Sequence, residues 1–295
     1  MSSDRALAEG SSKYAAILTM CAGVLFLATN DAVVKWLVTR YDPFQIVFVR
    51  SLIALPLTVS LVCFFDGPKG LRSERLPVHA LRGVLGVGAS FAFILSLRSL
   101  PLAEATALVF ASPLVVAGLS VPLLKEHVGW DRAAAIIVGF VGVLIIVRPG
   151  AATFQVASLL AVGASILYAL VMVSARWIDK RDSLWTMMLY MTVFAAVFSA
   201  FTLFSAWPTP IFSDVFLFLG TAVAGTLGLT LISQAFRMAP AAVVAPYDYT
   251  ALLWASLFGW LIWGVVPGLW VYGGAAVIIA SGIYLITSDR ASESE

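Results

Sequence analysis

The chain has 295 residues, of which 61% are hydrophobic and only 12% are charged. A soluble domain of this length needs far more charged surface, so the composition excludes an ordinary globular protein and favours a membrane protein. The net charge of +2 provides no basic face for phosphates and argues against a nucleic-acid partner, and the two cysteines, Cys21 and Cys63, lie in apolar runs where no disulfide framework or metal site is expected.

Apolar runs of 18 or more residues follow one another along almost the whole chain, and each matches the roughly 30 Å hydrocarbon core of a bilayer. The first run is too long for the apolar part of a signal peptide and is not closed by a cleavage site, so we interpret it as a spanning helix. The sequence thus predicts an all-α integral membrane protein with ten transmembrane helices. Their expected bounds are 14–38, 43–65, 77–97, 101–123, 130–147, 154–176, 183–206, 212–236, 240–263 and 268–287.

Lysine and arginine residues set the expected orientation, because cytoplasmic loops carry an excess of both. With a cytoplasmic N-terminus, the inside segments carry thirteen of these residues and the outside segments carry four, while Arg50 lies within a span. Both termini are therefore predicted to be cytoplasmic. The expected location is the cell membrane, which in a bacterium is the inner membrane.

Two parts of the chain, 14–147 and 154–287, resemble each other at a nearly constant offset. Asp42, for example, recurs as Asp182 at an offset of 140, and similar matches recur in several spans. Each part holds five expected spans, and this odd number requires the second five-helix repeat to be inverted. Inverted repeats with a binding site at their interface are a recurring transporter design, because one half can rock against the other.

The sequence resembles the EamA-type branch of the drug/metabolite transporter superfamily over nearly its whole length. The resemblance rests on the paired halves, the Ala-rich starts of the fourth and ninth spans, Ser112-Pro113 within the fourth span, and the Gly-rich fifth and tenth spans. It also rests on Leu123-Leu124-Lys125-Glu126 at the end of the fourth span. The second half departs from this pattern, because Leu261-Ile262-Trp263-Gly264 lacks an acid equivalent to Glu126.

The resemblance implies a secondary transporter of small organic metabolites that works by alternating access, with no cofactor. An exporter of amino acids, including aromatic ones, is the first expectation. The stretch from Asn30 to Lys35, followed by Arg50, also resembles the subgroup linked to uptake of S-adenosylmethionine or riboflavin, which is the alternative. The expected partners are the small-molecule substrate and the lipid bilayer. A proton as coupling ion, and a monomer or a homodimer, are left open.

A membrane-embedded enzyme or a channel is the alternative from another class. An enzyme needs reactive groups at one depth, but His79 and His127 lie near span ends in different loops, and neither His-Glu-x-x-His nor Gly-x-Ser-x-Gly occurs. A channel needs rings of carbonyls or charges, and a two-fold repeat suits alternating access better. The Gly-rich stretch 83–88 lies within an apolar span, so it is interpreted as helix packing rather than a dinucleotide motif.

Charged side chains inside spans are costly and mark candidate functional sites. Asp31 and Arg50 each lie about seven residues from the predicted outer ends of consecutive spans, so both are about 10 Å below the membrane surface. Lys35 lies one helical turn above Asp31. We predict that the three form one charge cluster. This cluster is either a gate or clamp for a substrate carboxylate or phosphate, or a structural ion pair that locks two helices.

Asp248 is the second charged candidate, near the middle of the ninth span. Pro246 lacks an N–H and interrupts this helix, as Pro113 does in the fourth span, and interrupted helices in both halves point to a transporter site. Asp248 is predicted to be a proton-coupling carboxylate or a ligand for a substrate amine, with Tyr247 and Tyr249 as neighbours. The alternative is a protonated or hydrogen-bonded acid packed against Arg237 or a tyrosine.

Other polar and aromatic residues inside spans are candidates for lining the substrate path. Glu104, near the outer start of the fourth span, is expected to cap that helix or to pair with Arg98. The candidates for the path are Asn30, Ser90, Phe91, Ser96, Thr106, Tyr168, Tyr190, Thr226, Thr230, Gln234 and Trp254.

Overall fold

The computed structural model describes residues 2–124, 130–149, 154–174, 182–204, 207–239 and 241–293, and the regular elements within these ranges are all helical. Seven segments of this described part are long and apolar enough to cross a membrane, which supports a multi-pass, all-α membrane protein. The count of ten spans and the sidedness of the termini stay predictions. The helices are α1 (Ser2–Leu37), α2 (Pro43–Phe65), η1 (Pro68–Leu71), α3 (Leu76–Ser96), α4 (Leu102–Val109), α5 (Ser112–Leu124), α6 (Trp130–Val147), α7 (Val156–Ser174), α8 (Leu184–Ser199), η3 (Ala200–Phe204), α9 (Phe212–Met238), α10 (Ala241–Val244), η4 (Ala245–Tyr249), α11 (Thr250–Trp263) and α12 (Leu269–Glu293).

Local sequence accounts for several helix ends. The Asp42 side chain accepts a hydrogen bond from the Phe44 backbone N–H at 2.9 Å and caps α2, which begins with a proline. Ser183 caps α8 in the same way, accepting from the Thr186 backbone N–H at 3.1 Å. α11 ends at Trp263 and is capped by Gly264, whose φ of 67° lies in the left-handed region that favours glycine.

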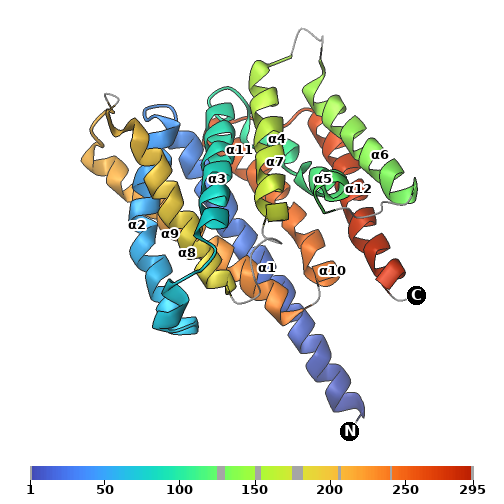
Figure 1. The fold of residues 1–295 in the computed structure, drawn as a ribbon. Helices are drawn as coiled ribbons and strands as arrows, with labels where there is room; N and C mark the ends of the chain where they lie inside the picture. Colours follow the sequence, from blue (N-terminus) through green and yellow to red (C-terminus); the bar gives the residue numbers. More distant parts are fainter. Residues whose placement is uncertain are drawn as a thin grey trace.

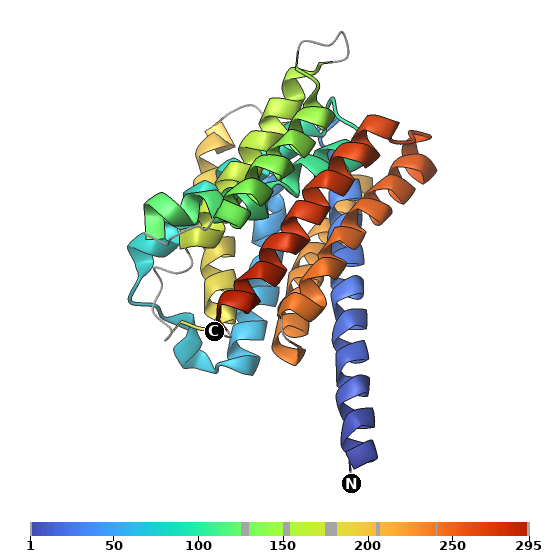
Figure 2. The same cartoon turned by 90° about the vertical axis from the view of Figure 1, so that its right-hand side faces the viewer.

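Two helices are longer than the hydropathy predicts. α1 begins at Ser2 rather than at residue 14, and α12 continues to Glu293 rather than ending at residue 287. The first turns of α1 project beyond the rest of the bundle (Figures 1 and 2). Hydropathy marks the part of a helix that suits lipid, whereas the helix itself continues into polar sequence of good helix-forming propensity.

Both predicted interruptions are present. The fourth predicted span is divided into α4 and α5 by a turn at residues 110–111, next to Pro113. In the ninth, the short α10 is followed by the 3₁₀ turn η4, which contains Pro246, before α11 begins. Since proline donates no backbone hydrogen bond and crowds the preceding turn, each site breaks the regular α-helical ladder.

Helices of the first half pack mainly on helices of the second half. α1 lies along α9, α3 along α7, α2 along α8 and α6 along α12, and the α6–α12 pair forms one edge of the bundle (Figure 1). In the order of the predicted spans, α1 is equivalent to α7 and α3 to α9, so exchanging the halves turns the α1–α9 pair into the α7–α3 pair. The α2–α8 and α6–α12 pairs each join equivalent helices and are unchanged. This is the pattern expected of two related halves, although the inverted repeat itself stays a prediction.

Glycines allow two of these pairs to approach closely. A Cβ at Gly142 of α6 would lie 2.8 Å from the Gly274 carbonyl oxygen of α12, and a Cβ at Gly274 would lie 2.6 Å from the Gly142 oxygen. Gly23 of α1 and Gly228 of α9 are related in the same way, at 2.9 Å each. Because the opposing atoms are backbone, they cannot yield as a flexible side chain would, so these contacts require glycine.

We therefore expect Gly142→Ala to lower the unfolding temperature of the protein in detergent, because overpacking costs about 1–3 kcal/mol. Gly273→Ala is the matched control on α12, since a Cβ there meets nothing within 4 Å and alanine favours helices. Thermal unfolding followed by size-exclusion chromatography measures both variants. An equal effect of the two substitutions would contradict the packing seen between α6 and α12.

Candidate functional site

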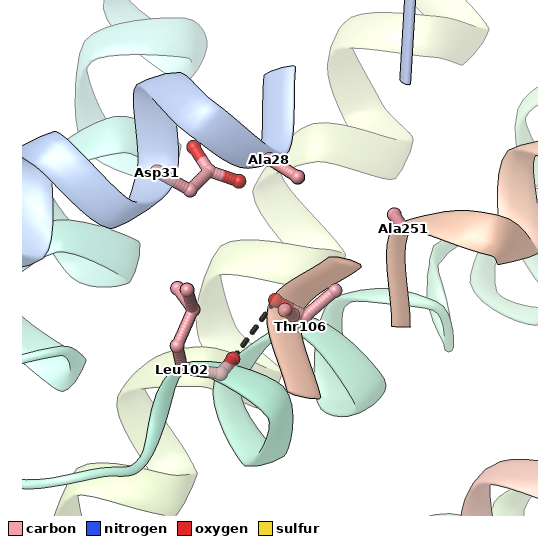
Figure 3. A pocket seen from close by; sticks show the side chains of 6 residues that line it. Ala28, Asp31, Leu102, Thr106 and Ala251 are labelled. Atoms are coloured by element: carbon pink, nitrogen blue, oxygen red, sulfur yellow. Dashed lines mark hydrogen bonds between the residues drawn. The ribbon is translucent and has the colours of Figure 1, made fainter. Parts of the chain in front are cut away.

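A small hollow lies beside the carboxylate of Asp31, between α1 and α4 of the first half and α11 of the second (Figure 3). Its volume is about 10 Å³, which is room for about one water molecule. A larger molecule fits only after these helices separate. The residues that line the hollow are Ala28, Asp31, Leu102, Thr106, Ala251 and Ala255.

The polar groups around Asp31 are incompletely satisfied. The Asn30 amide Nδ2 donates to Asp31 Oδ1 at 2.9 Å, and within the described ranges the other carboxylate oxygen has no hydrogen-bond partner. Asn30 is only 5% exposed, yet its Oδ1 is also without a partner there and lies toward Gly225 of α9. Buried polar groups are normally paired, so the Asn30 oxygen is unusual, although it faces α9 and does not line the hollow.

Arg50 of α2 provides the opposite charge. Its guanidinium interacts electrostatically with Asp31, but the described residues include no ion pair between them within 4.0 Å. The predicted proximity of Asp31 and Arg50 is therefore confirmed, whereas their direct contact is not present. Two opposite charges lie near each other without neutralising each other directly.

Lys35 does not join this pair, so the predicted cluster of three charges is wrong. Its Nζ donates to the Leu97 carbonyl at 2.7 Å and to the Leu100 carbonyl at 2.6 Å, just beyond the end of α3. The ammonium also lies 5.5 Å from the centre of the Trp263 ring. Helix spacing placed Lys35 above Asp31, but its long side chain turns toward the negative end of α3, which attracts a cation.

Asp248 belongs to a second group of polar residues. It interacts electrostatically with Tyr168 of α7 and with its neighbour Tyr249 in η4, and Tyr168 interacts in turn with Arg82 of α3. The Tyr249 ring meets the Phe110 ring edge-on at 5.1 Å, between the interrupted regions of the two halves. Tyr249 is expected beside Asp248 because the two are adjacent in the sequence, and its role stays a prediction. Tyr247 is 37% exposed and its role stays a prediction.

Of the other path candidates, Thr106 lines the hollow, whereas Trp254, Gln234 and Ser90 do not. Trp254 packs against the buried cluster that contains Met20, Gln234 is exposed on α9, and Ser90 is partly buried on α3. None of the three lines the hollow at Asp31, and their place on the substrate path stays a prediction.

Two further expectations concern glutamates. Glu104 interacts electrostatically with Arg148. The suggested pairing with Arg98 is wrong, because Arg98 donates instead to the carbonyls of Val38 and Tyr41 at 3.2 and 3.3 Å. Glu126 lies outside the described residues.

A polar network ties the α1–α2 connection to the start of α9. The Tyr41 hydroxyl donates to Asp214 Oδ2 at 2.8 Å and accepts from the Ile211 backbone N–H at 3.1 Å. Arg40, which is half exposed, forms an ion pair with the same carboxylate at 3.3 Å. We call this the Tyr41 network.

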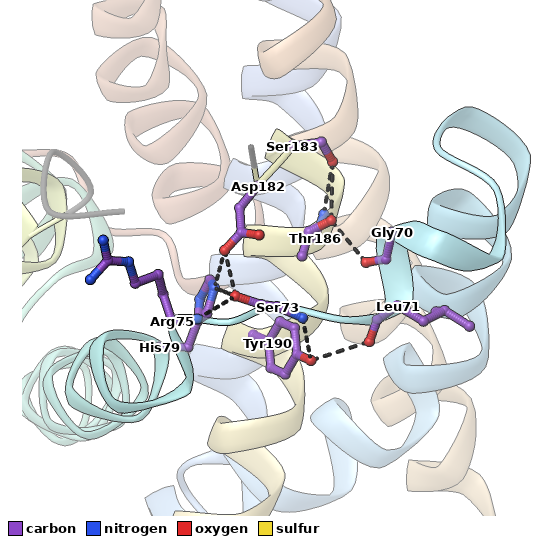
Figure 4. Close-up of polar contacts among 9 residues, drawn as sticks. All are labelled: Gly70, Leu71, Ser73, Arg75, His79, Asp182, Ser183, Thr186 and Tyr190. Atoms are coloured by element: carbon purple, nitrogen blue, oxygen red, sulfur yellow. Dashed lines mark hydrogen bonds and ion pairs between the residues drawn. The ribbon is translucent and has the colours of Figure 1, made fainter. Parts of the chain in front are cut away.

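A second network ties the segment before α3 to the start of α8 (Figure 4). Asp182 Oδ2 accepts from the Ser73 hydroxyl at 2.5 Å and lies 3.0 Å from Nε2 of His79, a side chain that is only 1% exposed. The His79 ring stacks on Tyr190 at 4.6 Å, and the Tyr190 hydroxyl donates to the Leu71 carbonyl. We call this the His79 network.

The two networks lie at opposite ends of the bundle. The Tyr41 network lies just before α2 and the His79 network just after it, and the 23 residues of α2 span about 34 Å. Each network joins a first-half segment to a second-half helix, so the halves are tied at both ends. Sequence reasoning missed both, because the partners are 173 and 103 residues apart. The one sequence feature that pointed to either network was the recurrence of Asp42 as Asp182, since Asp182 belongs to the His79 network.

Comparisons with known proteins agree on one family. The model of the EamA-like transporter family matches residues 14–148 and 155–288. The S-adenosylmethionine uptake transporter of Rickettsia bellii (strain RML369-C) is 30% identical over 272 residues, covering 91% of this chain and 92% of its own. The riboflavin transporter of Vibrio cholerae is 29% identical over 279 residues, covering 92% of each chain. One crystal structure superposes with a TM-score of 0.61 at 18% identity, covering 93% of this chain and 98% of its own, which shows the fold alone.

Proposed function

Because the chain belongs to the EamA-like transporter family of the drug/metabolite transporter superfamily, we propose that it carries a small zwitterionic metabolite by alternating access. Its family, its apolar helices and its bacterial relatives make it a multi-pass transporter of the bacterial inner membrane. The proposal concerns the substrate and the residues that bind it.

The observation that carries the proposal is the hollow at Asp31, with Arg50 nearby. A carboxylate inside a membrane is costly unless a cation balances it, and a guanidinium is costly unless an anion does. Here the two interact without contact. A substrate with an ammonium and a carboxylate satisfies both, since its ammonium binds Asp31 and its carboxylate binds the planar fork of Arg50.

This charge pattern ranks the candidate substrates. S-Adenosylmethionine has an ammonium, a carboxylate and an additional sulfonium cation, so it matches a site with opposite charges. Riboflavin carries neither an ammonium nor a carboxylate and would leave Asp31 and Arg50 unpaired. An amino acid has both groups but lacks the larger ring system. Together with the name of the Rickettsia bellii relative, this favours uptake of S-adenosylmethionine over the amino-acid export first expected from the sequence.

Transport requires the hollow to open toward each side in turn. Its lining comes from both halves, so rocking of one half against the other enlarges it, as inverted-repeat transporters do. The interrupted helices α4–α5 and α10–α11 border this region, and their broken backbone can bend without loss of regular hydrogen bonds. In the described conformation polar networks tie both ends of the bundle, and the hollow is too small for a metabolite.

Counterflow in proteoliposomes tests the proposed substrate. We expect purified protein to exchange labelled S-adenosylmethionine saturably and to exchange riboflavin or phenylalanine at least about tenfold more slowly. We expect Asp31→Asn to reduce S-adenosylmethionine exchange at least about tenfold, because a loss of about 1.4 kcal/mol in binding is already tenfold.

Asp131→Asn is the matched control, because Asp131 is exposed at the start of α6, away from the hollow. It removes the same charge and should leave exchange within twofold of the unmodified protein. Wild-type exchange of phenylalanine but not of S-adenosylmethionine would restore the amino-acid hypothesis. Full exchange by Asp31→Asn would remove Asp31 from the site.

We further propose that Asp248 couples transport to protons. It lies in the interrupted helix and interacts electrostatically with Tyr168 and Tyr249, and among the described residues it forms no ion pair with a cation. We expect Asp248→Asn to retain counterflow, which needs no driving force, but to lose accumulation driven by an imposed pH gradient. Equal losses in both assays would instead make Asp248 a substrate-binding or structural residue.

A further inference from the structure

A second and larger cavity lies next to the hollow, toward the end of the bundle that holds the Tyr41 network, and Leu102 lines both. Its volume is about 180 Å³. The lining residues come from α1, the α3–α4 connection, α4, and the end of α11 with the turn that follows it. They are Lys35, Ser99, Leu100, Pro101, Leu102, Gly259, Trp263 and Val265.

Lys35 gives this cavity a positive charge. Two of the three N–H groups of the ammonium are donated to the Leu97 and Leu100 carbonyls. Both acceptors are neutral, so they orient the ammonium without cancelling its charge. The third N–H remains for an anionic or strongly accepting group of a ligand, such as a carboxylate.

Much of the cavity lining is apolar. The Trp263 ring lies 5.5 Å from Lys35 Nζ, and Leu100, Pro101 and Val265 also line the cavity. An aromatic ring of a ligand can pack against the partly exposed indole, while its carboxylate reaches the ammonium, which lies over the same ring. Complete ligand pockets usually measure about 300–1,000 Å³. A cavity of about 180 Å³ therefore accommodates one end of a metabolite rather than all of it.

Leu102 separates this cavity from the hollow at Asp31. Its side chain lines both spaces and is only 1% exposed. Lys35 and Asp31 are four residues apart on α1, about 6 Å along the axis. A ligand held at Lys35 is therefore one helical turn from the carboxylate and needs only the displacement of Leu102 and its neighbours to reach it.

We propose that this cavity is a loading site that binds the carboxylate-bearing, ring-containing end of a zwitterionic substrate before that substrate enters the Asp31 site. This inference rests on the proposed function and adds a second binding position to it. The competing account is that Lys35 only caps α3. A cap contributes to stability, but it has no effect on how a substrate protects the cavity from chemical modification.

Thiol labelling separates the two accounts. The starting protein has Cys21→Ser and Cys63→Ser, and Ser99→Cys then places a thiol in the cavity, exposed and outside the Lys35 contacts. We expect S-adenosylmethionine to slow the reaction of this thiol with a membrane-impermeant methanethiosulfonate at least about fivefold. Protection should persist when Asp31→Asn is added, since that change removes the deeper site but not the loading site.

Transport kinetics provide the second readout. We expect Lys35→Met to raise the KM for S-adenosylmethionine at least about tenfold, with a smaller change in maximal rate, and to abolish protection of the Ser99→Cys thiol. Lys35→Arg should restore most of both. Lys69→Met, which removes an exposed lysine of η1 at the opposite end, is the control and should change neither.

The outcomes are distinct. If the unmodified protein transports S-adenosylmethionine but the substrate does not protect the Ser99→Cys thiol, or Lys35→Met lowers only thermal stability, Lys35 is a cap and the loading site is wrong. Protection that disappears with Asp31→Asn also overturns it, because the signal then comes from the deeper site. Absence of transport by the unmodified protein contradicts the proposed function itself, and the loading site with it.

Discussion

Inside a bilayer no water is available to pair polar groups, so the chain must pair each buried charge and backbone group itself. Two intramembrane cations of this protein, Lys35 and Arg82, meet that constraint through backbone carbonyls. Lys35 binds the end of α3, and Arg82 donates to the Val171 carbonyl at 2.7 Å. Asp31 and Arg50 are satisfied differently, because each interacts electrostatically with the other and the Asn30 amide also donates a hydrogen bond to Asp31. The candidate site is therefore placed where the Asp31 carboxylate and the Arg50 guanidinium interact without a direct ion pair between them in the described ranges.

The same constraint shapes the motion that transport needs. Packing across the halves is close, with glycines permitting backbone contact between α6 and α12 and between α1 and α9. These two helix–helix contacts are surfaces about which one half can tilt against the other while the contact itself stays buried. The Tyr41 and His79 networks, in contrast, are local polar ties at opposite ends of the bundle. The Tyr41 network is built on a tyrosine and an ion pair, and the His79 network on a buried histidine, so the two ends of the bundle are tied by different chemistry.

Sequence alone predicted much of this arrangement and failed in identifiable places. Hydropathy located the helices, and the positions of Pro113 and Pro246 predicted the interruptions, because both signals are local. The electrostatic interaction of Asp31 with Arg50 agrees with their expected positions on consecutive antiparallel spans, which followed from helix rise. The direction of the Lys35 side chain did not, since it depends on carbonyls 62 and 65 residues away. The partners of His79 and Tyr41 were missed for the same reason, as tertiary packing brings together residues that no spacing rule relates.

The central claim is that the two ends of a zwitterionic substrate bind the two unpaired charges, Asp31 and Arg50. A crystal structure of the protein with S-adenosylmethionine tests it most directly. The account predicts that the substrate ammonium lies within hydrogen-bond distance of the Asp31 carboxylate and that the substrate carboxylate lies against the Arg50 guanidinium, with Leu102 displaced. A substrate bound between the halves without contact to either charge would contradict it.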